Sequence, residues 1–219
     1  MTTAAALPFR GVIFDLDGTL IDSIEDIAAS VNAALVEFGF PTHTTAAYVA
    51  MMGEGASMLV SRALPAGNEA RVVEVLERYR THYARRLTQA TRPYPGIPEL
   101  LRALQSRGVR LGVLSNKRDD FTRAIVAALF PSVPWVAVFG ERAGVPKKPD
   151  PTAALEVASL MKLLPGEIAF VGDTRYDVHT ALAAGMQSVA VSWGLCGADD
   201  LRALGARRVI TTPLALLES

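Results

Sequence analysis

The sequence is poor in cysteine and has no block of one charge. Cys196 is the only cysteine, so a disulfide within the chain is excluded, and a reducing compartment fits. Lys plus Arg and Asp plus Glu both number 22, and no basic run occurs. Nucleic acid and anionic membrane surfaces are therefore poor candidate partners. The histidines, His43, His82 and His179, are scattered and lack the spacing of a zinc site.

Long hydrophobic runs are also missing. No stretch reaches the roughly 18 uninterrupted apolar residues that a membrane-spanning helix needs. The opening MTTAAALPFR has neither an early basic segment nor a long apolar stretch, so we expect no secretory signal. We expect a soluble, cytoplasmic protein that contacts no membrane.

Half of the 219 residues are hydrophobic, and they occur as short apolar runs that alternate with segments of helical periodicity. Alternation of nearly all-apolar strands with helices is typical of a parallel sheet covered on both faces. We therefore predict an α/β fold with a Rossmann-like parallel sheet. The predicted strands are residues 11–14, 109–114, 135–139, 168–171 and 188–191, and the predicted helices are residues 98–106, 121–129, 151–162 and 177–184.

Residues 23–92 break this alternation and contain no strand candidate. Residues 24–38, 56–64 and 69–87 read as helices, the first with an apolar side at Ile27, Val31, Ala34, Leu35 and Phe38. Prolines and a glycine at residues 93–98 then mark the return to the strand–helix pattern. We predict an α/β core of residues 1–21 and 94–219, with an inserted α-helical cap domain of residues 22–93.

Polar side chains follow the predicted strands of the core. Asp15, Asp17 and Thr19 follow the first strand, and Ser115 and Asn116 follow the second. The run 147–151 contains two lysines and opens a helix, and Asp173 and Asp177 follow the strand at 168–171. The carboxyl ends of parallel strands share one edge of a sheet, where ligands of such folds bind. We expect these groups to converge there.

Several carboxylates with a lysine and a hydroxyl suit a hard cation and a phosphate. Mg²⁺ prefers oxygen ligands and often bridges to phosphate, and a carboxylate can act as a nucleophile that forms an acyl phosphate. A second carboxylate two residues later can serve as acid and base. Taken one at a time, the same residues also fit ordinary roles as strand-end caps, a helix N-cap, a solvated turn lysine or acidic residues at a helix N-terminus.

Four segments, in order, carry a resemblance to a known family: "DLDGTLID", "LSNK", "KKPDP" and "GDTRYD". Together they resemble the signature motifs of the haloacid dehalogenase-like hydrolase superfamily. The inserted helices resemble its helical-cap subclass. "MGEGASMLVSRAL" and "YPGIPELLRALQSRGVRLGVLSNK" are most similar to the phosphoglycolate phosphatase-type branch.

The resemblance implies roles for the motif residues. Asp15 would be the nucleophile and a metal ligand. Asp17 would be the general acid and base, with its backbone carbonyl on the metal. Lys148, favoured over its neighbour Lys147, would bind phosphate and steady Asp15. Asp173 would bind Mg²⁺, and Asp177 would lie behind it, acting through water or toward Lys148.

The remaining assignments concern substrate and motion. Ser115, Asn116 and Thr19 are assigned to substrate binding, with Glu54 and Arg62 of the cap as further candidates; an exposed salt bridge is an equal alternative for the last two. The cap would close over the core about hinges at residues 20–23 and 92–96.

We expect an Mg²⁺-dependent phosphomonoesterase for a small phosphorylated metabolite, with 2-phosphoglycolate as a candidate, working through an aspartyl phosphate. A sugar-phosphate mutase and a pyrophosphate or nucleotide phosphatase of the same fold are the alternatives. Phosphonate cleavage would need a cap lysine, and residues 23–92 contain none. A non-enzymatic binding protein would be free to lose Asp15, Asp17, Lys148 or Asp173, yet all are present. Apolar cap faces permit a monomer or a homodimer.

Overall fold

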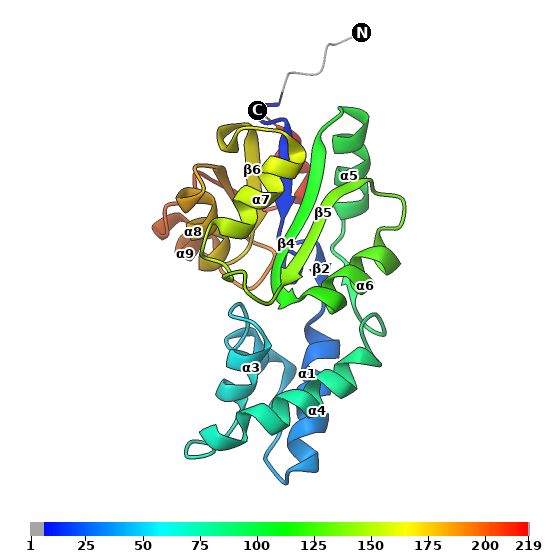
Figure 1. Ribbon diagram of the computed structural model, residues 1–219, viewed down its shortest axis with the longest axis vertical. Helices are drawn as coiled ribbons and strands as arrows, with labels where there is room; N and C mark the ends of the chain where they lie inside the picture. The colour runs from blue at the N-terminus through cyan, green and yellow to red at the C-terminus, as the bar shows by residue number, and fades with distance from the viewer. Residues whose placement is uncertain (1–6, 219) are drawn as a thin grey trace.

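A six-stranded sheet, parallel throughout, forms the centre of the computed structural model, which describes residues 7–218 (Figure 1). Its strand order is β5-β4-β1-β6-β7-β8. Neighbouring strands pair in parallel at every position of this order. This confirms the predicted α/β class. The strands are β1 (Gly11–Phe14), β4 (Arg110–Arg118), β5 (Trp135–Glu141), β6 (Ile168–Gly172), β7 (Gln187–Val191) and β8 (Arg208–Ile210).

Helices cover both faces of this sheet because its strands are apolar on both sides. In β1, Val12 and Phe14 belong to one apolar cluster, together with α5 (Ile97–Ser106) and α6 (Asp119–Leu129). Ile13 points to the opposite face and packs in a second cluster with α7 (Thr152–Met161) and α8 (Arg175–Ala183). Alternate side chains of a strand point to opposite faces, which explains the division.

The strand order reverses beside β1. The chain moves from β1 to β4 on one side, and β6 occupies the other side. In open α/β sheets a reversal of this kind leaves a crevice at the carboxyl ends of the strands, where ligands bind. Asp15 follows β1 and Asp173 follows β6, so both lie at the crevice.

Four helices lie between β1 and α5 and stand together at the lower end of the core in Figure 1. They are α1 (Ile24–Glu37), α2 (Thr45–Val49), α3 (Ala56–Ala63) and α4 (Val72–Ala84), and an antiparallel ribbon of β2 (Ile21–Asp22) and β3 (Arg92–Pro93) connects them to the core. The first predicted domain boundary falls within β2, and the second falls directly after β3. The division into two domains stays a prediction.

Some elements differ from those expected. The helix expected over residues 69–87 is shorter: residues Glu69–Arg71 form a 3-10 turn (η1), and α4 ends at Ala84. Five short elements were not expected, namely α2, β8, α9 (Ala198–Ala203) and the two ribbon strands β2 and β3. Elements of two to six residues are too short to show a hydrophobic period. Two further 3-10 turns, η2 (Pro165–Glu167) and η3 (Pro213–Leu217), complete the elements of residues 7–218.

No helix within residues 7–218 is long and apolar enough to cross a membrane. Residues 1–6, which make up most of the opening segment for which we expect no secretory signal, lie outside the described residues.

Candidate active site

Three buried carboxylates meet at the carboxyl edge of the sheet. Asp15 follows β1, Asp173 follows β6, and Asp177 lies in the first turn of α8. One oxygen from each lies within 4.8 Å of the others. Asp15 is 7% exposed and Asp173 is fully buried, so the charges are held away from water. The structure thus brings together residues that the sequence spreads over more than 150 positions.

Lys148 joins this cluster from the loop before α7. Its Nζ lies 2.8 Å from Asp15 Oδ1 and 2.6 Å from Asp177 Oδ1. Lys147 turns away toward Glu141, at 3.5 Å. Of the two adjacent lysines, Lys148 is therefore the one that neutralises part of the buried negative charge.

The cluster carries more negative charge than Lys148 can balance. Burial raises the pKa of Asp15 to about 7, against the attraction of Lys148 and with the help of repulsion from Asp177. Burial, followed by repulsion from Asp177 and Asp15, also raises the pKa of Asp173 well above its usual value. Burial acts to lower the pKa of Lys148, but the two carboxylates outweigh it, so that pKa is raised.

Close packing fixes the carboxylate of Asp173. Thr19 Oγ1 donates to Oδ1 at 2.9 Å, and the backbone N–H of Leu195 donates to Oδ2 at 2.7 Å. Gly18 has a φ of 83°, and a Cβ there would lie 2.2 Å from Asp173 Oδ2. A Cβ on Gly194 would lie 2.4 Å from the same oxygen. Only glycine fits at both positions, and one of them also needs positive φ.

Thr19 is fully buried, and its hydroxyl donates to Asp173. Its assignment to substrate binding stays a prediction. Gly194 and Leu195 were not singled out from the sequence. They follow β7 at the same sheet edge, so the rule that located the other groups would have found them.

The side chain of Asp17 lies outside the cluster of Asp15, Asp173 and Asp177. Lys117 Nζ lies 2.8 and 2.7 Å from its two carboxylate oxygens. Ser23 Oγ also donates to Oδ1, at 2.5 Å. Sequence reasoning missed Lys117, although it stands next to Ser115 and Asn116 in the same motif. The register of β4 against β5 shifts between Leu114 and Arg118, and such irregularities re-aim side chains.

Asn116 connects three parts of the site. Its Nδ2 donates to the carbonyl of Lys148 at 3.1 Å and to the carbonyl of Gly53 in the cap at 3.2 Å. Its Oδ1 accepts from the Lys148 N–H at 2.9 Å. The side chain thus fixes the lysine loop and the cap turn. Ser115, 5% exposed, lies on the pocket wall.

Glu54 and Arg62 pair with each other at the cap side. Their side chains form a salt bridge and are 27% and 31% exposed. Arg62 also donates to the Met51 carbonyl at 3.0 Å. Neither is among the residues that line the pocket. Their assignment to substrate binding stays a prediction.

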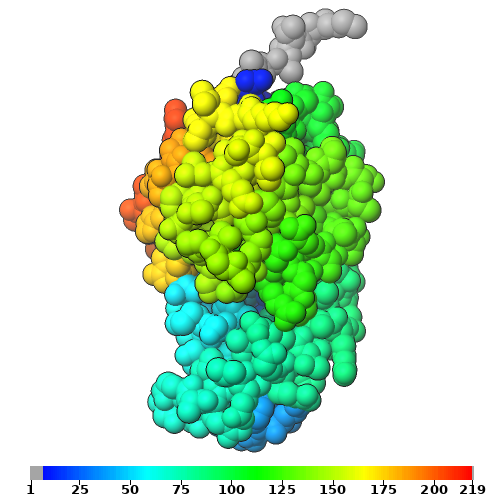
Figure 2. Space-filling view, viewed as in Figure 1, coloured from blue at the N-terminus to red at the C-terminus, as the bar shows by residue number. Residues whose placement is uncertain are grey.

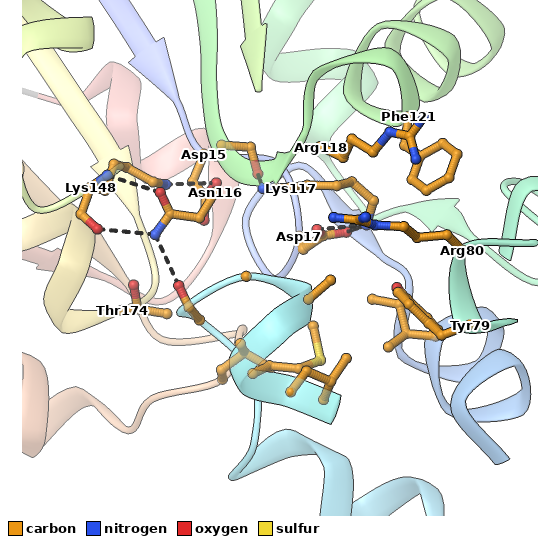
Figure 3. A pocket seen from close by; sticks show the side chains of 18 residues that line it. Asp15, Asp17, Tyr79, Arg80, Asn116, Lys117, Arg118, Phe121, Lys148 and Thr174 are labelled. Atoms are coloured by element: carbon orange, nitrogen blue, oxygen red, sulfur yellow. Dashed lines mark hydrogen bonds and ion pairs between the residues drawn. The ribbon is translucent and has the colours of Figure 1, made fainter. Parts of the chain in front are cut away.

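A pocket of about 70 Å³ opens between the cap and the core. Figure 3 shows its polar wall, with Asp15, Asn116 and Lys148 at one end and Asp17 and Lys117 at the other. The facing wall comes from the cap and is mostly apolar, with Met52, Leu59 and Tyr79, and Arg80 of α4 is its charged residue. In Figure 2 the atoms of the cap abut the end of the core over this region.

The donor set fits a hard divalent cation. Carboxylate oxygens are the ligands that such ions prefer, and Asp15 and Asp173 both have raised pKa values because their negative charge is buried and incompletely balanced. A cation would relieve this repulsion. The acidic cluster can therefore hold a metal ion.

Comparison with known proteins agrees with this geometry. The family model for haloacid dehalogenase-like hydrolases matches residues 12–191. A phosphoglycolate phosphatase from Pseudomonas putida is 36% identical over 214 residues, which cover 95% of this chain and 78% of the relative. One from Rhodospirillum rubrum is 35% identical over 91% of this chain and 86% of its own length. A crystal structure of a candidate phosphoglycolate phosphatase from Lactobacillus delbrueckii subsp. bulgaricus superposes with a TM-score of 0.91 at 28% identity, covering 97% and 98% of the two chains.

The chain belongs to the haloacid dehalogenase-like hydrolase family. Within it, the chain is a phosphatase, and its substrate is a small phosphorylated molecule. The resemblance expected from the four motifs is confirmed.

Proposed function

We propose that the protein is an Mg²⁺-dependent phosphomonoesterase that works through an aspartyl phosphate on Asp15. The observation that carries the proposal is the position of Lys148 Nζ, within 2.8 Å of Asp15 and 2.6 Å of Asp177, beside the buried Asp173. The names of the relatives make 2-phosphoglycolate the first candidate substrate. A cavity of about 70 Å³ supports a small metabolite.

The residues divide the chemistry between them. Lys148 holds Oδ1 of Asp15, which leaves the second oxygen for attack on phosphorus. Asp17 donates a proton to the ester oxygen as the P–O bond breaks and the alcohol leaves. It then takes a proton from the water that attacks the acyl phosphate, so that inorganic phosphate is released and Asp15 is restored. Ser115, on the pocket wall, would hydrogen-bond the phosphoryl oxygens.

Asp15, Asp173 and the backbone carbonyl of Asp17 would hold Mg²⁺, with Asp177 behind them on Lys148. A bound Mg²⁺ supplies positive charge to the phosphoryl oxygens and offsets repulsion among the carboxylates. The apolar cap wall of Met52, Leu59 and Tyr79 would exclude water from the reacting groups when the cap is closed. A cytoplasmic location and a monomeric or homodimeric state stay predictions.

Replacement of the nucleophile tests the proposal. We expect Asp15→Asn to lower Mg²⁺-dependent phosphate release from p-nitrophenyl phosphate and from 2-phosphoglycolate by at least about a thousandfold, because the covalent route is lost. Asp199→Asn makes the same chemical change at a side chain that is 99% exposed, and serves as the control. Turnover of D15N within tenfold of the wild type, or full activity in EDTA, would rule the proposal out.

Product analysis separates this activity from the mutase alternative. A phosphomonoesterase releases inorganic phosphate from a sugar phosphate, whereas a mutase returns the phosphoryl group to the sugar. We expect free phosphate with no isomerised product.

A further inference from the structure

Both oxygens of the Asp17 carboxylate are occupied in this structure. Lys117 Nζ contacts them at 2.8 and 2.7 Å (Figure 3). Ser23 Oγ adds a hydrogen bond of 2.5 Å to Oδ1. Lys117 is almost enclosed, with 7% of its side chain exposed. The proposed reaction requires Asp17 to face the ester oxygen of the substrate, so another group must first compete for Lys117.

The surroundings of Lys117 favour an anionic competitor. Among residues 7–218, Asp17 is the only carboxylate within 4 Å of Lys117 Nζ. Two arginines also line the pocket, and each has an acidic partner outside the catalytic set. Arg80 pairs with Glu77, and Arg118 lies 2.7 Å from Asp120. Lys117 is therefore the cation of this end of the pocket that depends on a catalytic carboxylate for its neutralisation.

The aromatic contact of Lys117 keeps it in place while its partner changes. Its Nζ lies 4.7 Å from the centroid of the Tyr83 ring, on cap helix α4. Cation–π contacts of this kind attract an ammonium group without using its hydrogen-bond donors. Lys117 can thus exchange one anion for another without leaving the pocket wall.

We propose that Lys117 selects phosphate esters whose leaving group carries its own carboxylate, because that carboxylate takes Lys117 from Asp17 and frees Asp17 to face the ester oxygen. The inference rests on the proposed function and adds a specificity residue to it. The preferred substrate then gains in turnover as well as in binding. An uncharged ester leaves Asp17 in its ion pair, so it reacts slowly even when bound.

The short distance between the two groups limits the length of the substrate. Asp17 must reach the ester oxygen, and Lys117 Nζ lies within 2.8 Å of Asp17. A carboxylate that contacts Lys117 therefore lies only a few ångströms from the ester oxygen. This fits a separation of one or two carbon atoms, and a longer chain would carry the charge past Lys117.

A pair of substrates that differ only in charge tests the inference. We compare kcat and KM for 2-phosphoglycolate and for its primary amide in the wild type, Lys117→Met, Lys117→Arg and Lys147→Met. For K117M we expect the preference for the carboxylate over the amide to fall by about tenfold or more, with a fall in the kcat ratio, because a charge-assisted contact is lost. K117R keeps a cation and should restore part of the preference.

Lys147→Met is the matched control. Lys147 pairs with Glu141 at 3.5 Å and donates to the Glu54 carbonyl at 3.3 Å, so its loss removes a nearby positive charge without touching Asp17. We expect it to leave the preference unchanged. If K117M does not fold, as judged by circular dichroism, the uncharged Lys117→Gln gives the same comparison.

A preference in K117M that falls by less than tenfold, or a loss that is equal for both substrates, would overturn the role of Lys117 and leave the phosphatase intact. A wild type that hydrolyses both compounds equally well would do the same. A wild type that releases phosphate from neither compound, nor from p-nitrophenyl phosphate, would overturn the proposed function itself.

Discussion

The core edge and the cap differ in where their charged side chains lie: they are buried at the core edge and mostly exposed in the cap. The core edge holds four buried charged residues: Asp15, Asp173, Asp177 and Lys148. One oxygen from each carboxylate lies within 4.8 Å of the others, and Lys148 Nζ lies 2.8 Å from Asp15. In the cap, the charged pairs Glu37–Arg78 and Arg71–Glu74 lie at the surface. The proposed chemistry depends on the first arrangement, while the second keeps the cap solvated.

The difference follows from the environment of each charge. Interactions between charges are strong where water is excluded and weak at the surface. A buried set of carboxylates is costly unless it is compensated, and its presence at a sheet edge indicates a site that binds a cation and an anion together. The cap contributes mostly apolar side chains to the pocket, such as Met52 and Leu59, together with Arg80.

One cap residue departs from this pattern. Asp26 in α1 is the only buried charged residue among residues 23–92. Its Oδ2 accepts hydrogen bonds of 2.8 Å from the backbone N–H groups of Ala90 and Thr91 and from Thr91 Oγ1. Asp26 thus joins α1, which follows the predicted hinge at residues 20–23, to residues 90–91, which precede the predicted hinge at residues 92–96. Buried charge thus serves structure at this junction, whereas we assign it to chemistry at the core edge.

The largest expected effect comes from breaking the core cluster. Lys148→Met leaves its carboxylates without their cation, and loss of one partner of a buried pair costs about 3–5 kcal/mol. We expect phosphate release to fall by about a hundredfold or more, since the phosphoryl group loses the same charge. The checks are Mg²⁺-dependent phosphate release and urea unfolding, with Lys147→Met as control. Activity of K148M within threefold of the wild type would contradict the idea that the chemistry depends on the buried charges of the core edge.

The junction should show a large effect on stability. Asp26→Ala leaves buried donors without an acceptor, and we expect it to lower the free energy of unfolding by about 3 kcal/mol. Glu25→Ala, at the exposed neighbouring position of α1, should change it by less than about 0.5 kcal/mol. Urea denaturation of both variants gives the comparison. Equal values for D26A and E25A would show that this junction does not depend on buried charge.

Metal binding should stabilise the core in a pH-dependent way. The pKa of Asp15 in the folded protein is about 7, above its usual 3.8, so its contribution to stability is present below pH 4 and lost as the pH rises through 7. A cation that needs ionised Asp15 should offset this loss. We expect Mg²⁺ to raise Tm more at pH 8 than at pH 5, at about 2–4 °C per kcal/mol for a chain of this size.

Thermal unfolding with Mg²⁺ and with EDTA at the two pH values measures this difference. Asp173→Asn, which lacks a proposed ligand, is the reference and should show little rise. The same rise in Tm at pH 5 and pH 8 would argue against a metal on Asp15.

The smallest effect is expected at the cap surface. Glu54→Ala and Arg62→Ala break a partly exposed salt bridge, and such pairs contribute about 1 kcal/mol or less. If the two residues act only on each other, each variant should keep KM for 2-phosphoglycolate within about twofold. If they contact the substrate, as the sequence also allows, KM should rise by about tenfold or more. Steady-state kinetics of the two variants decides between these roles.

Sequence patterns predicted the convergence of Asp15, Lys148 and Asp173 because the carboxyl ends of parallel strands meet at one edge, whatever the exact loop lengths. The apolar strands themselves were evident for the same reason, since burial on both faces leaves runs such as residues 11–14 and 168–171. These features depend on local sequence and on general topology.

Other features depend on contacts that no local pattern encodes. The ion pair of Lys117 with Asp17 follows from the irregular pairing at the end of β4 and links residues 100 positions apart. The pairing of Glu54 with Arg62 was one of two equal alternatives, because long side chains at a surface can face a partner or a ligand. The anchoring role of Thr19 requires knowing how closely Gly18 approaches Asp173.

The proposed mechanism requires that Asp15 becomes covalently phosphorylated within a site built by loops from separate strands. Rapid acid quenching during turnover, followed by mass spectrometry of the peptide that contains residues 12–22, tests it most directly. We expect a phosphoryl group on Asp15 in the presence of Mg²⁺ and none in EDTA or in D15N. A phosphoryl group on any other residue, or an unmodified Asp15 during rapid turnover, would contradict it.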